Sequence, residues 1–383
     1  MSKIDKLIQQ YCPNGVEYVH LEDVVKIKNG KDYKHLKEGD IPVYGSGGIM
    51  TCVDTYAYDK PSVLLPRKGS IGNIFYVDTP FWTVDTCYYT EVYEDVIIPK
   101  FLYYVLTTKD LAKLNTASGA VPSLTQSVLY KLEIPLPPLP IQEEIVRILD
   151  TFSELQAELQ AELQARQQQY AYYKRILFSK DYPTMKIGDI TRVFSASRVH
   201  KNEWKTSGVP FYRSSDVISF HRGEKNSRGD VFISEELFEK LSAKSGKIRI
   251  GDLLVTGGGT IGVPYIVQFE PLYVKDADLL CIVKNDILDN RFLYHYMKSE
   301  QFHDYLSSIT HDATIAHYTI SQIKETPVPV PSWEKQQRLI DILDRFDTLV
   351  NDLSQGLPAE IEARRQQYEY YRDKLLTFNI KNS

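Results

Sequence analysis

The chain has 383 residues, enough for two or more domains with separate cores. Hydrophobic residues make up 43% of it, but no apolar run reaches the length of a membrane span, and the first residues lack the apolar core of a signal peptide. The net charge of −5 argues mildly against nucleic-acid binding, although it leaves room for local basic patches. Four scattered cysteines argue against a zinc site and indicate a reducing cytoplasm: Cys12, Cys52, Cys87 and Cys281.

The first 140 residues predict a globule of mixed helices and strands. A short helix from Ile4 to Tyr11 ends at a Pro-Asn-Gly turn, and a basic loop follows between Lys26 and Lys37. Apolar runs then predict strands at 62–65, 73–77 and 87–92, and a helix at 99–108. The globule closes on four prolines, Pro135, Pro137, Pro138 and Pro140, which bar the next helix from starting earlier.

Residues 141–178 predict one long helix, within a segment that we place at 141–180. Apolar side chains recur in steps of three and four from Ile141 to Leu177, as in the seam of a coiled coil. At about 1.5 Å per residue the rod is roughly 57 Å long, so we expect a spacer between domains. It also contains short Leu-Gln-Ala-Glu units between Leu155 and Ala165.

The same order repeats in the second half of the chain. Residues 181–332 predict a second globule, in which the Phe-Leu-Tyr run at Phe292 matches that at Phe101 and Pro329 matches Pro135. Residues 333–383 then predict a second long helix, where Ile342 aligns with Ile148 and the same apolar seam runs through Ile342 and Leu349 to Leu375. This helix carries about one extra turn near Gly356 and Pro358, so we expect a kink or break there.

Basic and hydroxyl side chains in the loops are the candidate DNA contacts, because lysine neutralises phosphate and arginine also recognises guanine. In the first globule these are Lys26, Lys28, Lys31, Lys34, Ser46, Arg67, Lys68 and Ser70. In the second globule they are Arg192, Arg198, Lys201, Lys205, Arg213, Ser214, Ser215, Arg222, Lys225, Arg228 and Thr260. An ordinary solvated surface with acids interspersed explains the same pattern, so both interpretations stay open.

Two glycine-rich loops, around Gly69 and Gly259, fit either tight turns or anion cradles. Neither ends in Gly-Lys-Ser/Thr, which argues against nucleotide binding. His311 and His317 flank Asp312, but no nucleophile elbow accompanies them, so we predict no catalytic residue and no metal site in this chain. Tyrosines cluster at both helix ends. Tyr170, Tyr173, Tyr368 and Tyr371 are candidates for a subunit interface, and packing within this chain alone is the other interpretation.

With these features together, the chain resembles the DNA-specificity subunit of type I restriction–modification enzymes. The resemblance covers essentially the whole chain, and its most specific parts are the Leu-Pro-Ala-Glu-Ile run at Leu357 and the Arg-Gln-Gln-Tyr-Glu-Tyr-Tyr run at Arg365. The opening run from Tyr11 to Tyr18 is also similar to the start of many such subunits. One departure is that the first helix has Leu-Gln-Ala-Glu units where the second has Leu-Pro-Ala-Glu-Ile.

The resemblance implies an α+β fold, with two repeated α/β target recognition domains separated by two long helices that form an antiparallel coiled coil. It implies that residues 1–140 and 181–332 each read one half of a bipartite double-stranded DNA site. Two methyltransferase subunits, and through them restriction subunits, would dock on the chain, and those partners would bind S-adenosylmethionine, ATP and Mg²⁺. A cytoplasmic coiled-coil adaptor that binds only protein is the alternative, although it has no need of basic loops on duplicated globules.

Overall fold

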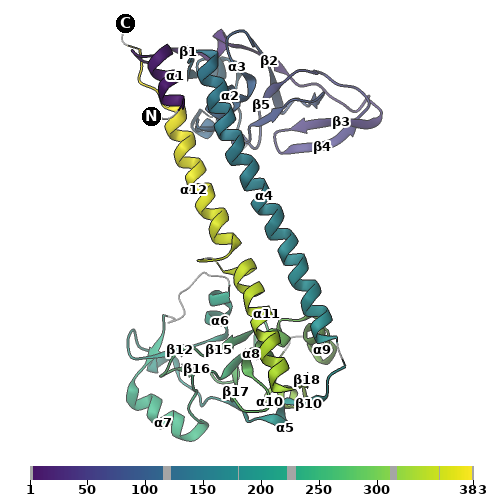
Figure 1. The fold of residues 1–383 in the computed structure, drawn as a ribbon, viewed down its shortest axis with the longest axis vertical. Coiled ribbons are helices and arrows are strands. Elements are labelled where there is room, and N and C mark those ends of the chain that lie inside the picture. Colours follow the sequence, from purple (N-terminus) through teal and green to yellow (C-terminus); the bar gives the residue numbers. More distant parts are fainter. Residues whose placement is uncertain are drawn as a thin grey trace. The chain divides into compact units, whose positions relative to one another are not determined.

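The longest element is helix α4, which runs unbroken from Leu139 to Phe178 (Figure 1). The computed structural model describes residues 3–114, 122–179, 181–221, 230–310, 317–352 and 354–381. Helix α4 starts two residues before the predicted Ile141 and includes Pro140, so the expectation that this proline precedes the helix is wrong. Proline fits the first turn because the amide it lacks has no partner within the helix there.

The second long helix is broken, as Gly356 and Pro358 predict. Helix α11 spans Trp333–Asn351 and helix α12 spans Leu357–Leu376. Gly356 lies between them in a tight turn, where a Cβ atom would come within 2.4 Å of the carbonyl oxygen of Thr348. No side chain fits that space, so glycine at this position permits the close turn.

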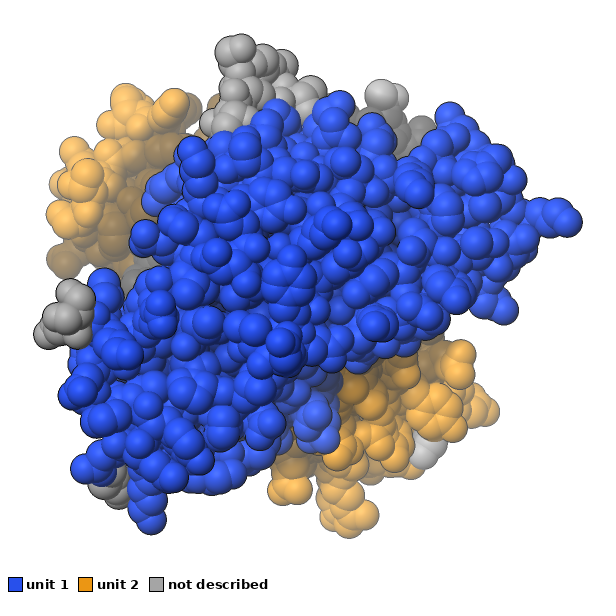
Figure 2. Space-filling model, turned by 90° about the horizontal axis from the view of Figure 1, so that it is seen from above, with its two compact units in different colours: residues 1–158, 361–383 blue, residues 159–360 orange. Residues whose placement is uncertain are grey.

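By its internal contacts the chain falls into two units. Unit 1 contains residues 1–158 and 361–383, and unit 2 contains residues 159–360 (Figure 2). Each unit therefore combines one globule with part of each long helix. Within each unit the two helix segments run antiparallel (Figure 1). None of the helices in the described ranges has the length and apolarity needed to cross a membrane.

The globule of unit 1 contains a four-stranded and a three-stranded sheet. The first has the order β2-β8-β5-β6, formed by Val25–Asn29, Cys87–Val92, Ser62–Pro66 and Phe75–Val77. The second has the order β4-β3-β7, formed by Gly48–Val53, Glu38–Gly45 and Trp82–Thr83. Strands β1 (Tyr18–His20) and β9 (Glu133–Pro135) pair with each other apart from these sheets. The helices of this globule are α1 (Lys3–Tyr11), α2 (Pro99–Thr107) and α3 (Gln126–Tyr130).

The globule of unit 2 repeats this plan. Its four-stranded sheet has the order β11-β17-β14-β15, formed by Val193–Ser195, Leu279–Ile282, Leu253–Thr256 and Pro264–Ile266. Its three-stranded sheet has the order β13-β12-β16, formed by Phe232–Ile233, Val209–Tyr212 and Tyr273–Val274. In both globules the central strand of the small sheet pairs in parallel with the strand that comes later in the chain, β3 with β7 and β12 with β16.

The remaining elements of unit 2 show where the two copies differ. Strands β10 and β18, Thr184–Lys186 and Pro327–Pro329, pair as β1 and β9 do. The helices are α5 to α10: Ile187–Ile190, Ser214–His221, Glu235–Ser245, Asn290–Met297, Glu300–Thr310 and Ile320–Glu325. Helix α6 begins where unit 1 has the hairpin of β3 and β4, so the shared plan diverges after the central strand of the small sheet.

The long helices are part of the globule cores. Ile141, Ile145 and Leu149 of α4 are fully buried in the unit 1 core, and Leu339 and Leu343 of α11 are buried in the unit 2 core. Each such side chain contributes about 1.5–3 kcal/mol by its removal from water. A helix held this way is fixed to its globule by the same packing that stabilises the globule.

The predicted seam is only partly covered. Leu155 on α4 and Ile342 on α11 are 42% and 43% exposed, and Leu349 is 36% exposed. Within each unit the helices contact mainly through aromatic rings, because Phe152 meets Tyr371 and Phe346 meets Tyr170 at centroid distances of 5.5 and 5.8 Å. The expectation of a continuous apolar seam is therefore wrong at these three aliphatic positions.

Candidate nucleic-acid interface

Three loops of unit 1 meet at a set of main-chain hydrogen bonds. The amide of Arg67 donates to the carbonyl oxygen of Thr86 at 2.9 Å, and the amide of Leu124 donates to the carbonyl oxygen of Arg67 at 2.9 Å. Gly69 follows in the left-handed region with φ +84°, and its amide donates to Pro122 at 3.1 Å. We call the Arg67, Thr86 and Leu124 arrangement the loop frame.

Unit 2 contains the same loop frame at corresponding positions. The amide of Gly257 donates to the carbonyl oxygen of Asp278 at 2.8 Å, and the amide of Tyr318 donates to Gly257 at 2.9 Å. Gly259 repeats the left-handed conformation of Gly69, with φ +73°. The two globules are therefore copies at the level of individual hydrogen bonds, while the side chains on the frame differ.

The loop frame of unit 1 brings together four predicted DNA contacts: Ser46, Arg67, Lys68 and Ser70. Ser46, at the tip of the β3–β4 hairpin, is tied to the frame because its carbonyl oxygen accepts a hydrogen bond from Asn73 Nδ2 at 3.0 Å. Lys68 and Ser70 are exposed beside it. Arg67 is half-buried, donates from Nη1 to Asp85 at 3.3 Å and lies over the ring of Tyr88.

The other four predicted contacts of unit 1 lie on β2 and in the loop after it. Lys26 is exposed on β2, and Lys28 pairs with Glu91 at 3.2 Å, which raises the pKa of Lys28. Lys31 is held next to β7, because Trp82 Nε1 donates to its carbonyl oxygen at 2.9 Å, while its side chain stays exposed. Lys34 is exposed further along the same loop.

In unit 2 Arg213 and Ser214 already have partners within the chain, as does Arg192, whose Nη2 donates to the carbonyl oxygen of Ser245 at 2.8 Å. Arg213 donates to both carboxylate oxygens of the buried Asp216, at 2.7 and 2.8 Å, and also to Asp230 at 2.9 Å. Ser214 is buried, and its hydroxyl donates to the carbonyl oxygen of Asp278 at 2.6 Å. Both side chains therefore fasten α6 and its surroundings, a role that the sequence does not reveal.

The remaining predicted contacts of unit 2 lie on its surface. Ser215 and Thr260 are exposed near the loop frame, and Arg198 and Lys201 are exposed before β12, as are Arg192 and Lys205. Arg222, Lys225 and Arg228 lie outside the described residues, as do His311 and Asp312. Among the residues that are described, no three His, Cys, Asp or Glu side chains are grouped to hold a metal ion.

Comparison with known proteins decides the family. The model of the "Type I restriction modification DNA specificity domain" matches residues 13–166 and again residues 179–363. The chain belongs to this family. A putative type I restriction enzyme specificity subunit of Haemophilus influenzae is 32% identical over 397 residues, with 98% of each chain covered. A type I restriction enzyme specificity subunit of Escherichia coli is 30% identical over 292 residues, covering 73% of this chain and 70% of that one.

Solved structures of the family share the fold. The crystal structure of the type I S subunit from Mycoplasma genitalium gives a TM-score of 0.63 at 17% identity, covering 94% of this chain and 96% of that one. The HsdS subunit from Thermoanaerobacter tengcongensis gives a TM-score of 0.52 at 16% identity, covering 96% and 97%. The α+β fold with two repeated recognition domains and two long helices is thereby confirmed.

The four tyrosines predicted to lie at a subunit interface face the chain's own helices. Tyr170 is only 4% exposed and stacks on Phe346, and Tyr173 packs against the same ring. Tyr368 and Tyr371 pack in the same way against Phe152. Tyr173 and Tyr371 are nevertheless 38% and 37% exposed, so the subunit interface stays a prediction, and the neighbouring residues Tyr172 and Tyr370 are 53% and 62% exposed.

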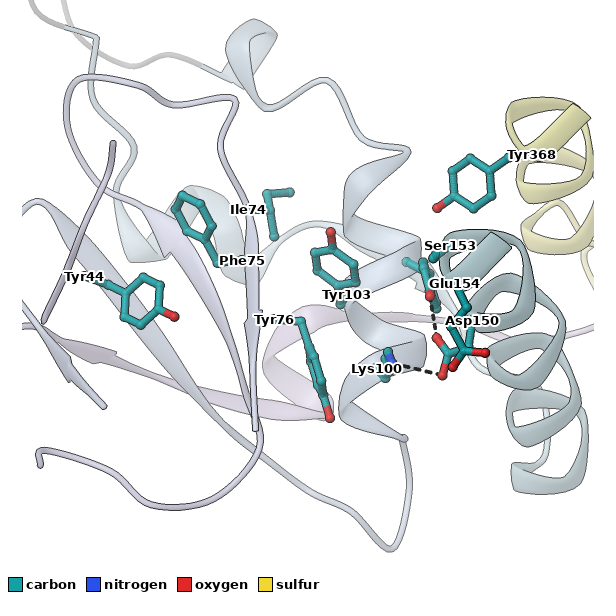
Figure 3. Close-up of a pocket in the computed structure, with 11 residues that line it drawn as sticks. Tyr44, Ile74, Phe75, Tyr76, Lys100, Tyr103, Asp150, Ser153, Glu154 and Tyr368 are labelled. Carbon is teal, nitrogen blue, oxygen red and sulfur yellow. Dashed lines mark hydrogen bonds and ion pairs between the residues drawn. The ribbon is translucent and has the colours of Figure 1, made fainter. Parts of the chain in front are cut away.

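Each unit of this type I family member also has a cavity beside its helices. In unit 1 a cavity of about 400 Å³ is lined by Tyr44, Tyr76 and Tyr103 of the globule and by Tyr368 of α12 (Figure 3). In unit 2 a cavity of about 610 Å³ is lined by Tyr294 and Tyr170, which match Tyr103 and Tyr368 in the repeat. The duplication therefore extends to the hollows between globule and helix.

Sequence reasoning missed the buried polar residues that connect helices to globules. Gln142 accepts from the amide of Ile98 at 2.8 Å and donates to Val96 and Pro137; Gln336 makes the matching bonds in unit 2. Asp150 pairs with Lys100 at 2.9 Å, and Asp344 pairs with Arg291 at 2.7 Å. Gln142 and Gln336, like Asp150 and Asp344, are separated by the same offset along the chain, and this shared offset is the signal that would have found them.

Proposed function

We propose that this chain recognises a bipartite DNA target, with one half-site read by each globule. The observation that carries the proposal is the duplicated loop frame with different side chains around it. A common frame positions the two globules' loops alike, and unlike side chains give each globule its own base preference. The exposed Lys31, Lys68, Arg198 and Lys201 then neutralise phosphates without reading sequence.

The long helices serve as a scaffold for partner subunits. We infer two methyltransferase subunits per chain, because the cavities and the exposed tyrosines Tyr172 and Tyr370 occur once in each half. A solved relative with a TM-score of 0.58 is described in terms of complex assembly and conformational transition of the type I system. Restriction subunits join through the methyltransferase subunits, and S-adenosylmethionine, ATP and Mg²⁺ belong to these partners rather than to the non-catalytic chain.

Domain exchange tests the assignment of half-sites. Residues 21–134 are replaced by the equivalent segment of another family member, and methylated sites are mapped in DNA modified by the complex. The expected result is a change in one half-site only. If both half-sites change, the globules do not read DNA independently and the proposal fails.

A gel shift tests whether the complex prefers particular DNA sequences. The chain, co-purified with its methyltransferase subunits, is offered a random bipartite DNA library in a gel shift, and selected sequences are read. Recovery of no preferred sequence favours the alternative of an adaptor that binds only protein.

Light scattering of the same complex tests the stoichiometry. It is expected to give two methyltransferase subunits per chain, and a one-to-one complex contradicts that inference.

A further inference from the structure

Two neighbouring apolar side chains project into solvent from the β3–β4 hairpin of unit 1. Ile49 is 62% exposed and Met50 is 57% exposed. In a regular strand, adjacent side chains point to opposite faces. Here the pairing shifts, because Ile49 lies opposite Tyr44 while Thr51 lies opposite Val43, which leaves Met50 as the extra residue of a bulge. Bulges re-aim side chains, and this one leaves both large apolar groups uncovered.

The tip of this hairpin is held against the loop frame. A Cβ atom on Gly45 would lie 2.7 Å from the sulfur of Met50 and 3.4 Å from Thr86 Oγ1, so glycine lets Met50 lie across the hairpin. Ser46, next along the chain, is bound by Asn73 and donates its amide to Thr86 Oγ1 at 3.4 Å. The hairpin that carries the apolar pair is thus tied, through Ser46 and Asn73, to the loop that carries Lys68 and Ser70.

We propose that Ile49 and Met50 contact thymine C5-methyl groups in the major groove of the half-site read by unit 1. The inference rests on the proposed function. A two-stranded β-ribbon fits the major groove, and apolar contact with the methyl group is how side chains distinguish thymine there. The neighbouring Lys68 and Ser70 supply the phosphate contacts that orient a ribbon in the groove.

The second globule argues for DNA rather than a protein as the occupant. Directly after the matching strand β12 the chain enters α6, where Val217 is buried, in the place where unit 1 has its hairpin. A surface for a methyltransferase subunit that docks twice is expected in both copies. An element that differs between the two copies, as the β3–β4 hairpin and α6 do, fits a reader of bases, since two unlike half-sites need unlike readers.

Uracil substitution tests the contact. The complex of the chain with its methyltransferase subunits is bound to duplexes of its own mapped target, in which each thymine of the first half-site is replaced in turn by uracil. Uracil keeps every hydrogen-bonding group and lacks only the methyl. At least one replacement is expected to weaken binding about fourfold, the value of one buried methyl group.

The variant Ile49→Ala/Met50→Ala is then compared on the same duplexes. It is expected to bind the thymine target several-fold more weakly and to bind thymine and uracil targets equally. Ile287→Ala, which removes a side chain of similar exposure (49%) from unit 2, is the control and is expected to keep the discrimination. Thermal melting confirms that both variants fold.

Three outcomes overturn the inference: a first half-site without thymine, an intact complex that binds uracil and thymine duplexes alike, or a hairpin variant that loses methyltransferase subunits while keeping DNA discrimination. Failure of the proposed function is distinguishable, because the wild-type complex then selects no bipartite sequence at all. An intact bipartite preference without any effect of uracil removes this inference alone.

Discussion

The ring of His295 in α8, fully buried, lies with Nε2 2.6 Å from Oδ1 of Asp344 in α11. Burial lowers the pKa of His295, and the bond to Asp344 offsets this only in part. Burial by itself raises the pKa of Asp344, but His295 and Arg291 lower it overall. The pair fastens the second globule to its long helix.

Stability of unit 2 should therefore fall on mild acidification. Because the folded pKa of His295 lies below its ordinary value of 6.5, the unfolded chain takes up the proton first as the pH falls through that value. The contribution of His295 to the free energy of unfolding is fully present above pH 6.5 and is lost progressively below it. Melting temperatures at pH 7.5 and 5.5 should differ less for His295→Gln, which keeps a neutral donor, than for wild type. Tyr104→Phe, at the matching position of unit 1, should leave the pH dependence unchanged.

Removal of either buried glutamine should loosen one globule and not the other. Gln142→Ala leaves the amide of Ile98 and two carbonyl groups without their partner, and an unpaired buried group costs about 1–3 kcal/mol. Hydrogen exchange at Ile98 should accelerate in Gln142→Ala, and exchange at Asp289 in Gln336→Ala. The exposed Gln164→Ala on α4 is the matched control. Equal acceleration at both sites in either variant would contradict independent attachment.

Substitution of Lys68 should weaken DNA binding, whereas substitution of Arg213 should lower the stability of unit 2. Lys68 is exposed beside the loop frame, so Lys68→Ala should weaken binding to all DNA sequences alike and lower the salt slope by about one. Arg213→Lys loses the two-pronged bond to Asp216 and should destabilise unit 2 by roughly 2 kcal/mol. Salt titrations of DNA binding and denaturant unfolding separate the two effects. A normal salt slope for Lys68→Ala would remove it from the interface.

A further Leu-Gln-Ala-Glu unit inserted after Glu162 should lengthen the gap between half-sites. Fully buried residues of α4 end at Leu149 and resume at Tyr170, while Leu163, next to the insertion point, is partly buried against the unit 2 core, so the insert lies at the edge of that core. Four residues add about 6 Å, between one and two base pairs, and turn the helix only about 40° past a full turn. Mapping of methylated sites decides it, and an unchanged gap means that α4 does not set the spacing.

A two-residue insert at the same place is the matched control. It rotates the helix segments on either side of the insert by about 200° relative to one another, so the Phe152–Tyr371 and Tyr170–Phe346 contacts cannot both be kept. This variant should be less stable than the four-residue variant, as thermal melting will show. Equal stability of the two would mean that the aromatic contact contributes little.

The sequence predicts those features that depend on local pattern. The repeat, the long helices and the break at Gly356 follow from periodicity, glycine and proline. Which stripe of a helix is covered depends on its neighbour, so Leu155 was expected inside and lies exposed. Arg213 shows the same limit at the site, because its type fits DNA and only the fold reveals that Asp216 occupies it. The bulge that uncovers Met50 leaves no periodic signal, so Ile49 and Met50 are not among the predicted contacts, although Ser46 at the tip of the same hairpin is.

The loop frame is built from amide and carbonyl groups alone, and this has a consequence for how such proteins diversify. Substitution of a side chain on these loops leaves the bonds between Arg67, Thr86 and Leu124 in place, because every residue type except proline supplies the same amide. New side chains at position 67 therefore leave the hydrogen bonds of the frame unchanged. The second copy has glycine at the matching position, where a Cβ atom on Gly257 would lie 2.8 Å from the carbonyl oxygen of Ala277, so variation of the side chain at this position is confined to the first copy.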